Sequence, residues 1–310
     1  MQKKAHMAGI LFATIFGFTF MFSKIAMEYV SPMGLIAYRF LIAFLAFEVL
    51  RLFKVININF KKKDIKPLLF VAIFQPILYF LLETYGLAKT SSGEAGMMIA
   101  LIPIFVTILS TLILKEKPKL LQLIFIVLSV SGILFIQMSK SGEGIQVEVL
   151  GFALLFGAVL AAAMFNIASR SASRSLKPYE VTYFMMLSGA VIFNVIYLIQ
   201  LALGNQTLDY FTNLGHIELL IPILYLGVIA SIGGFFFVNY ALSKLPAHVS
   251  SIYTNLSTIV AIAAGAIFLS ERLYYYHIIG SLMIIIGVYG TVRLNNGSKK
   301  KKSPPIQPTP

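Results

Sequence analysis

The stretch that decides the fold is Tyr85–Gly132, YGLAKTSSGEAGMMIALIPIFVTILSTLILKEKPKLLQLIFIVLSVSG, because the chain contains it twice in outline. A second copy, shifted forward by 155 positions, aligns with it without a gap. In both copies a basic loop, a long apolar run, an acidic-basic break and an apolar run with glycine follow one another. The matched landmarks are Tyr85–Lys89 with Tyr240–Lys244, Leu114–Lys117 with Leu269–Arg272, and Gly132 with Gly287. An internal repeat of this kind indicates two similar structural units.

The composition is that of an integral membrane protein. Of the 310 residues, 58% are hydrophobic and 12% are charged, and the mean hydropathy is +0.87; in a soluble chain about a quarter of the residues are charged. Lys and Arg outnumber Asp and Glu by 25 to 12. They lie in short loops between apolar runs, so they indicate membrane topology and not a nucleic-acid-binding face. The chain has no cysteine and its four histidines are scattered, so neither a metal site nor a cofactor is expected.

Ten apolar runs have the length of about 20 residues that crosses a bilayer. Connections rich in Lys, Gly, Asn or Asp separate several of them. The sequence therefore predicts an all-α polytopic membrane protein with ten transmembrane helices. The runs cover residues 6–28, 33–53, 67–88, 92–114, 119–138, 149–170, 178–202, 218–242, 247–269 and 273–293.

Basic residues indicate the orientation, because cytoplasmic loops carry an excess of Lys and Arg. With the N-terminus in the cytoplasm, the opposite side keeps Lys89, Lys140 and Arg272, and all the other loop cations are cytoplasmic. We therefore expect a multi-pass protein of the plasma (inner) membrane with both termini in the cytoplasm. The tail, residues 294–310, combines four consecutive lysines with four prolines and is predicted to be disordered.

Five helices in each half would place the second half in the membrane upside down relative to the first, since five is an odd number. The expected repeats are residues 1–138 and 149–293, joined by a loop at 139–148. Two similar halves of opposite orientation can exchange conformations and so open a central site to either side. This inverted repeat is the main reason to expect a carrier.

The order of landmark residues in each half also resembles that of a known family. In the first half the landmarks are Lys24, Pro32, Arg39–Phe40, Tyr85–Leu87, Leu101–Pro103 and Leu114–Glu116. Together they resemble the EamA unit of the drug/metabolite transporter superfamily. The second half is similar at Pro178, Leu269–Glu271 and Gly287, but it has Thr258 in place of Pro103 and no arginine matching Arg39.

The resemblance implies a ten-helix basket around a central cavity. The first four helices of each half would line the cavity, and the fifth and tenth helices would lie at the periphery. It also implies transport of amino acids, other metabolites or drug-like solutes, with export as the expected direction. It does not select one substrate.

Three ionisable residues, Lys24, Arg39 and Glu83, lie at similar depth in the outer half of the predicted membrane. Charges inside membrane helices are costly, and each one is a functional candidate. If their helices are neighbours, Glu83 can neutralise one cation and leave the other to attract an anionic or zwitterionic solute. The alternative is that Lys24 and Arg39 extend to the interface and that Glu83 is a structural partner.

Gln75, Tyr79 and Glu83 recur at i, i+4 and i+8, which predicts one polar stripe on the third helix. In lipid such a stripe must face protein or a water-filled cavity. Pro76 is expected to kink this helix, since it removes a backbone hydrogen bond.

The second half offers polar groups without charge. Asn239, Tyr253 and Asn255 are expected to face the cavity, whereas Asn166 is expected to form an interhelical hydrogen bond. Helix packing is the alternative for all of them, because polar side chains commonly join membrane helices.

Glu116 and Glu271 each close one helix and precede the next. We expect a structural role, in which the carboxylate interacts with the positive N-terminal end of the following helix and has Lys117 or Arg272 as counter-charge. The inversion places the two glutamates on opposite membrane faces.

Small residues allow membrane helices to approach closely. Gly132, Gly280 and Gly287 lie on the fifth and tenth helices. Internal packing is the usual role of such residues, and a homodimer formed through these two helices is the alternative.

Together the patterns predict a secondary membrane transporter that moves a small organic solute by alternating access. The chain has no Gly-x-x-x-x-Gly-Lys motif, so ATP is not expected to drive it directly. A membrane enzyme or a lipid-handling protein is the alternative from another class. It would need a cluster of carboxylates and histidines at one membrane face, and the sequence offers none that is convincing.

Overall fold

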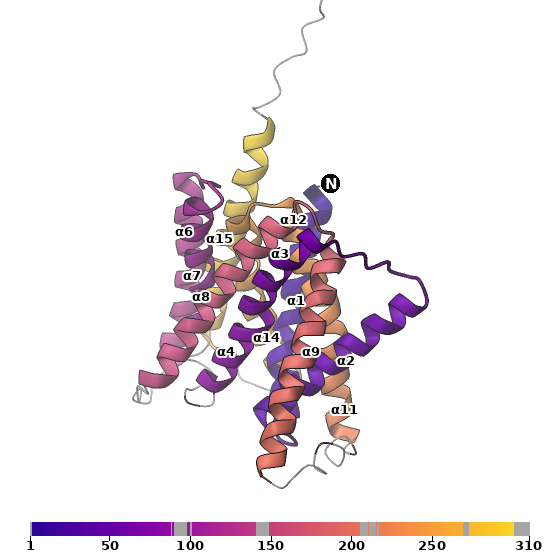
Figure 1. The fold of residues 1–310 in the computed structure, drawn as a ribbon. Helices are drawn as coiled ribbons and strands as arrows, with labels where there is room; N and C mark the ends of the chain where they lie inside the picture. The colour runs from indigo at the N-terminus through magenta and orange to yellow at the C-terminus, as the bar shows by residue number, and fades with distance from the viewer. Residues whose placement is uncertain are drawn as a thin grey trace, which may run out of the picture.

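The computed structural model describes residues 2–87, 89, 98–99, 101–140, 149–204, 210, 215, 217–268 and 273–300. Within these ranges all regular secondary structure is helical, as the sequence predicts (Figure 1). The elements are α1 (Gln2–Ala26), α2 (Pro32–Leu52), α3 (Lys62–Ala72), the π segment η1 (Ile73–Leu78), α4 (Tyr79–Leu87), α6 (Ile102–Leu112), α7 (Leu120–Lys140), α8 (Val149–Ala172), α9 (Pro178–Leu203), α11 (Ile217–Leu224), the π segment η3 (Tyr225–Gly234), α12 (Phe235–Lys244), α13 (Ala247–Ser251), α14 (Thr254–Phe268) and α15 (Tyr275–Lys300).

In the described part of the chain, eight helical stretches are long and apolar enough to cross a membrane. Three of them are composite: α3, η1 and α4 form one, α11, η3 and α12 form another, and α13 with α14 forms the third. Two further apolar helices, Ile102–Leu112 and Leu120–Ile136, are shorter. Each of the ten predicted runs overlaps one of these helices, and over the described residues eight of the helices reach the expected length.

Helix starts follow local sequence signals. The Ser31 hydroxyl accepts a hydrogen bond from the Gly34 N–H (3.2 Å), one of the N–H groups that a helix start leaves unpaired, and Pro32 occupies the first turn. At α9 the Glu180 carboxylate accepts from the Lys177 N–H (2.8 Å), again with proline in the first turn. These caps place the boundaries of α2 and α9 within a residue of the predicted ones.

The third span is kinked, as Pro76 predicts. Gln75 has φ −152° and ψ 120° in the middle of the span, because a following proline disfavours helical backbone. This kink contradicts the predicted stripe of three polar residues. Gln75 is out of helical register with Tyr79 and Glu83, so the polar stripe on this span consists of the latter two alone.

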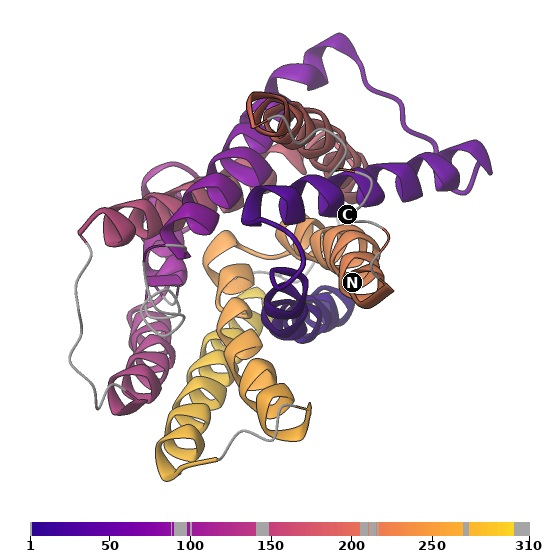
Figure 2. The ribbon, with the colours of Figure 1, turned by 90° about the horizontal axis from the view of Figure 1, so that it is seen from below.

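The helices of the first half (through α7) pack against those of the second half (from α8) in a reciprocal pattern. The first helix of one half, α1, lies against the third and fourth of the other, η3/α12 and α14. Equally, α8 lies against α4 and α6, while α2 packs on α9 and α7 on α15 (Figure 2). The contacts therefore keep their form when the two halves are exchanged.

The helices α7 and α15 pack mainly against each other at the edge of the bundle (Figure 2). Their glycines lie inside this contact: a Cβ on Gly132 would come 2.7 Å from the Gly280 carbonyl oxygen, and one on Gly287 would come 2.5 Å from the Phe125 carbonyl oxygen. These glycines therefore lie in a contact within one chain. They no longer support the alternative of a homodimer formed through α7 and α15.

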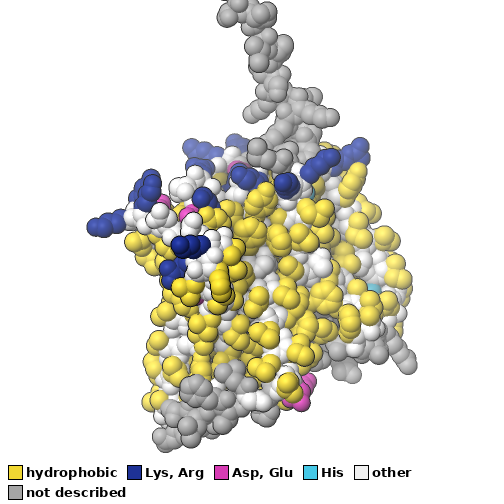
Figure 3. Space-filling model, turned by 90° about the vertical axis from the view of Figure 1, so that its right-hand side faces the viewer, with side chains coloured by type: hydrophobic (Ala, Val, Ile, Leu, Met, Phe, Trp, Pro, Cys, Tyr) yellow, Lys and Arg dark blue, Asp and Glu magenta, His cyan; other side chains and the backbone are white. Residues whose placement is uncertain are grey.

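One end of the bundle carries exposed Lys and Arg side chains above a mainly apolar belt (Figure 3). We call this end the basic face. It includes Lys61, Lys62, Lys63, Lys115, Lys117, Lys119, Arg174, Lys177 and Lys244. The helix α15 continues to Lys300, past the predicted end of the last span at residue 293; the rest of the predicted tail, residues 301–310, lies outside the described residues.

Candidate functional site

Arg39 of α2 is a buried charge at the junction of the two halves. Its side chain is 7% exposed, and its Nε donates to the hydroxyl of Ser231 in η3 (2.7 Å). Ser231 in turn donates to the Leu226 carbonyl (2.7 Å). A buried cation is expensive unless it is paired, so its position between α2 and η3 marks the strongest candidate site in the described part of the chain.

Aromatic rings surround the guanidinium. Its Cζ lies 5.0 Å from the ring centre of Phe80 in α4 and 6.0 Å from that of Phe40, within the range of a cation–π interaction. Phe80 also contacts Phe40 edge-on (5.1 Å) and Phe235 of α12 (6.3 Å). The rings stabilise the charge without occupying its hydrogen-bond donors.

The guanidinium has donors to spare. Among the described residues Ser231 is its hydrogen-bond partner, and the ion pairs within 4 Å are Glu48–Arg51 and Glu116–Arg170. The fully buried side-chain polar atoms that lack a partner in this part of the chain are Ser173 Oγ and His248 Nδ1. Among the described residues the terminal nitrogens of Arg39 have no hydrogen-bond partner, so they can donate to an added anion.

Tyr79 and Glu83 of α4 and Tyr225 of η3 are the polar neighbours of Arg39. All three interact with it electrostatically. Glu83 is half-buried and interacts with Arg39 without an ion pair within 4 Å among the described residues. The structure thus brings Arg39, Tyr79 and Glu83 together, as expected if their helices are neighbours. Lys24 lies on α1, and its side chain is outside the described residues.

The polar residues of the second half have partners on neighbouring helices. Asn239 is fully buried; its Oδ1 accepts from the Ser169 hydroxyl (2.6 Å) and its Nδ2 donates to Thr182 Oγ1 (2.9 Å). Asn255 Nδ2 donates to Ser129 Oγ (3.1 Å). These contacts favour the packing alternative for both amides over a place in the cavity.

Tyr253 is also committed to packing. It is 3% exposed, its hydroxyl is hydrogen-bonded to His6 Nδ1 (2.8 Å), and Gly9 leaves the room in which its ring sits. Asn166 departs from expectation as well, since its Nδ2 donates to the Ala162 carbonyl of its own helix (2.8 Å) and not to another helix.

Glu116 does not cap the helix that follows it, which corrects the sequence-based interpretation. Its Oε1 accepts from Arg170 Nε of α8 (2.9 Å), and its Oε2 accepts from the Ala247 N–H at the start of α13 (2.8 Å). The counter-charge is therefore Arg170 and not Lys117. Glu271 lies outside the described residues.

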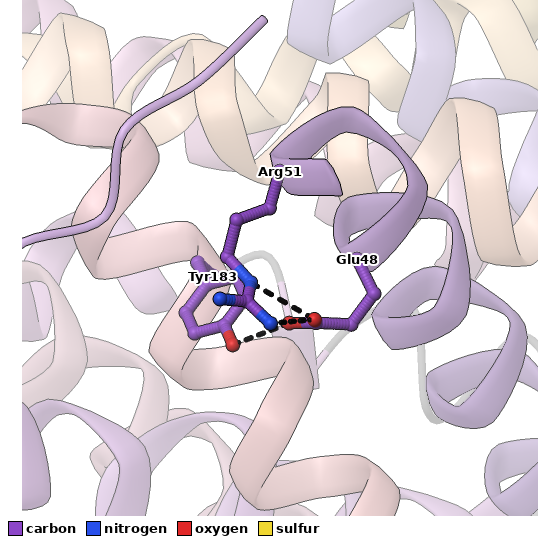
Figure 4. A network of polar contacts seen from close by, with 3 residues as sticks. All are labelled: Glu48, Arg51 and Tyr183. Carbon is purple, nitrogen blue, oxygen red and sulfur yellow. Dashed lines mark hydrogen bonds and ion pairs between the residues drawn. The ribbon is translucent and has the colours of Figure 1, made fainter. Parts of the chain in front are cut away.

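Two polar clusters that the sequence did not predict also join the halves. In one, Glu48 of α2 accepts from Arg51 Nε (2.9 Å) and from the hydroxyl of Tyr183 in α9 (2.5 Å), as Figure 4 shows. In the sequence, Arg51 looks like an ordinary surface arginine and Tyr183 like an ordinary aromatic residue of a helix. No spacing rule connects positions 48 and 183, so the sequence gives no sign of this cluster.

The other cluster contains three tyrosines on α2, α9 and the connection after α9. Tyr38 donates to the Tyr210 carbonyl (2.7 Å), and Tyr210 donates to Asn194 Oδ1 (2.6 Å). Burial, with a smaller contribution from Tyr197, raises the pKa of the Tyr210 hydroxyl, which keeps it protonated as a donor.

No group of three or more His, Asp or Glu side chains that could hold a metal ion occurs in the described ranges. The arrangement at Arg39 is suited to binding a solute by charge and aromatic contact.

The comparison with protein families decides the class. The sequence model of the EamA-like transporter family matches residues 3–138 and again residues 149–293. The chain belongs to the EamA-like transporter family. The family resemblance predicted from the landmarks of each half is thereby confirmed, and this EamA-like protein is a membrane transporter and not an enzyme.

Relatives of this transporter carry the same kind of name. An uncharacterized transporter of Bacillus subtilis (strain 168), YcxC, is 36% identical over 307 residues, which are 99% of this chain and 97% of the relative. A probable amino-acid metabolite efflux pump of Escherichia coli (strain K12) is 24% identical over 299 residues, 93% of this chain and 95% of the relative. A solved structure titled "Crystal structure of protein" superposes with a TM-score of 0.78 at 13% identity, over 97% of this chain and 99% of its own, and so shares the fold.

Proposed function

We propose that this transporter is a secondary carrier that moves a small organic anion or zwitterion across the plasma membrane by alternating access, with Arg39 as the group that binds the negative charge. The observation that carries the proposal is the buried guanidinium between the two halves, which has a single hydrogen-bond partner among the described residues. A solute held there contacts elements of both halves, α2 and η3.

The two halves are proposed to be inverted repeats of five spans each. The reciprocal packing of α1 with α14 and of α8 with α6 supports a two-fold relation between them. Since each half has an odd number of spans, the axis of that relation lies in the membrane plane, so the relation turns one half upside down. Such a pair can rock about the site at its centre and open it to either side.

The basic face is proposed to be cytoplasmic, because Lys and Arg are retained on that side of the membrane. The N-terminus and the ends of α12 and α15 lie at this end (Figure 1). Both termini are then cytoplasmic. Export is the proposed direction, and its support is that the Escherichia coli relative is named an efflux pump.

Glu83 is proposed to balance Arg39 when no solute is bound. It lies one helical turn beyond Tyr79 on the same face of α4, and it interacts with Arg39 electrostatically. An anionic solute that binds the guanidinium replaces part of this interaction. Lys24 remains a proposed second cation of the site, whereas Gln75, Asn239, Tyr253 and Asn255 are proposed to shape the helices around it.

Flux measurements test the proposal. Purified protein in liposomes is loaded with a panel of labelled amino acids, organic acids and neutral metabolites. We expect flux of a solute with a carboxylate, and its loss in both Arg39→Ala and Glu83→Ala with unchanged membrane insertion. Arg174→Ala, which removes an exposed arginine of the basic face, is the matched control and is expected to transport normally. Normal flux in both site variants would contradict the proposal.

A further inference from the structure

Glu116 and Arg170 form a hydrogen-bonded unit that ties the two halves together at the basic face. Glu116 lies in the connection between α6 and α7, in the first half. Arg170 lies at the end of α8, in the second half, and the two side chains meet at 2.9 Å. Arg170 Nη1 also donates to the Leu242 carbonyl at the end of α12 (2.9 Å).

The second carboxylate oxygen of Glu116 adds another link between the halves. It accepts from the Ala247 N–H (2.8 Å), the first residue of α13. One side chain of the first half is thus bonded to the ends of three helices of the second half, directly to α8 and α13 and through Arg170 to α12. Charge-assisted hydrogen bonds of this kind are stronger than neutral ones.

The backbone is shaped to present this side chain. Lys115 has φ +58°, a left-handed conformation that residues with a side chain seldom adopt. The turn that it makes lets the Glu116 N–H donate to the Ser110 carbonyl of α6 (3.1 Å). Glu116 is therefore attached firmly to the end of α6, and a movement of α6 carries the carboxylate with it.

The unit is accessible to water and so can open. The side chains of Arg170 and Glu116 are 25% and 20% exposed. Directly beside them His248 is buried and interacts electrostatically with both charges, and its Nδ1 has no hydrogen-bond partner among the described residues. Separation of the pair would admit water to this nitrogen, which lowers the cost of the open state.

We propose that Glu116 and Arg170, with the backbone of Leu242 and Ala247, are the gate of the basic face, closed in this structure and open when the central site faces that side. The inference rests on the proposed alternating access, in which the halves separate at one face at a time. Every bond of Glu116 to the second half must break for the basic face to open. A bond between two residues of the same half can stay intact during this movement.

A single-cysteine experiment tests the gate, because the chain has no native cysteine. Ser251→Cys places the thiol one helical turn behind Ala247, at a position that is 2% exposed. The rate of its reaction with a maleimide is measured in lipid nanodiscs without any solute. We expect about tenfold faster labelling when Glu116→Gln or Arg170→Gln is added, since one such hydrogen bond is worth about a factor of ten in an equilibrium constant.

Glu180→Gln is the matched control. Its carboxylate also caps a backbone N–H at the basic end of the bundle, that of Lys177, but donor and acceptor belong to the same half. Labelling in this control is expected to match the parent. In the variant with both Glu116→Gln and Arg170→Gln, the increase is expected to be well below the product of the two single effects, because both changes break one interaction.

Equal labelling rates in Glu116→Gln and Glu180→Gln would overturn the gate. If a glutamine variant is not recovered as folded protein, Arg170→Lys replaces it, because lysine keeps the charge but lacks the planar fork that binds Glu116 and Leu242 together. The labelling rate of Arg170→Lys is then compared with that of Glu180→Gln, and equal rates would again overturn the gate. The labelling experiment uses no solute, so its result does not depend on whether flux is detected in liposomes. Failure of the gate and failure of the proposed function can therefore be told apart.

Discussion

Replacing Gly132 by alanine separates internal packing from dimerisation. Gly132 of α7 faces α15, where a Cβ would lie 2.7 Å from the Gly280 carbonyl oxygen and 2.9 Å from Met283 Cβ. Both neighbours are backbone or the first side-chain atom, so neither can rotate away. The helices must therefore move apart.

The size of the effect follows from this geometry. An ordinary carbon–oxygen contact is about 3.3–3.6 Å, so the two helices must separate locally by about 0.6–0.9 Å. A gap of this size forfeits a quarter to a half of the dispersion energy of each affected contact. Overpacking of a well-packed interface costs about 1–3 kcal/mol, which corresponds to a fall in melting temperature of about 2–4 °C per kcal/mol.

The assay is thermal unfolding in detergent, combined with a mass measurement by light scattering. We expect Gly132→Ala to lower the melting temperature by several degrees with no change in oligomeric state. Gly233→Ala is the control, because its nearest neighbour would be Ile15 Cδ1 at 3.9 Å. Conversion of a dimer to a monomer at an unchanged melting temperature would refute the reasoning and place Gly132 at a contact between two copies.

Two further substitutions distinguish packing from transport. Asn239→Ala leaves the Ser169 hydroxyl without its acceptor, and we expect a loss of stability of about 1–3 kcal/mol with normal flux per folded molecule; absent flux in a stable variant would return Asn239 to the transport path. Phe80→Leu removes the ring 5.0 Å from the Arg39 Cζ, which is worth about 1–2 kcal/mol, so the KM for an anionic solute is expected to rise about five- to thirtyfold. Phe80→Tyr, which keeps the ring, is expected to stay near the parent, and an unchanged KM in Phe80→Leu would show that the ring does not position the guanidinium.

The site at Arg39 contains both residues that the sequence identified and one that it did not. The sequence places Lys24, Arg39 and Glu83 at similar depth and predicts that Glu83 neutralises one of the two cations if their helices are neighbours; the choice of Arg39 comes from the structure. The sequence did not predict Ser231, which lies in a run of small residues without any charge and yet holds the guanidinium. A serine is chemically suited to many places in a membrane helix, so only its position relative to α2 identifies its role.

The errors have a common physical origin. The i, i+4, i+8 spacing includes Gln75 in a stripe only if the helix is continuous, and the backbone before Pro76 interrupts the register. The sequence predicts that Glu116 interacts with the helix that follows it, whereas its partners lie 54 and 131 residues away. In both cases the position of the side chain depends on an irregular backbone or a distant contact, which the neighbouring sequence does not encode.

By itself the sequence determined that this is a membrane protein of two similar halves and where most of its helices begin and end. These properties depend on the length of apolar runs against the thickness of a bilayer and on local caps such as Ser31 with Gly34. Only the tertiary structure decided which polar groups pair, as Asn239 does with Ser169 and Glu116 with Arg170. Inside a membrane any apolar helix can face lipid or protein equally well, so hydropathy does not encode the neighbour, and close packing between helices selects it.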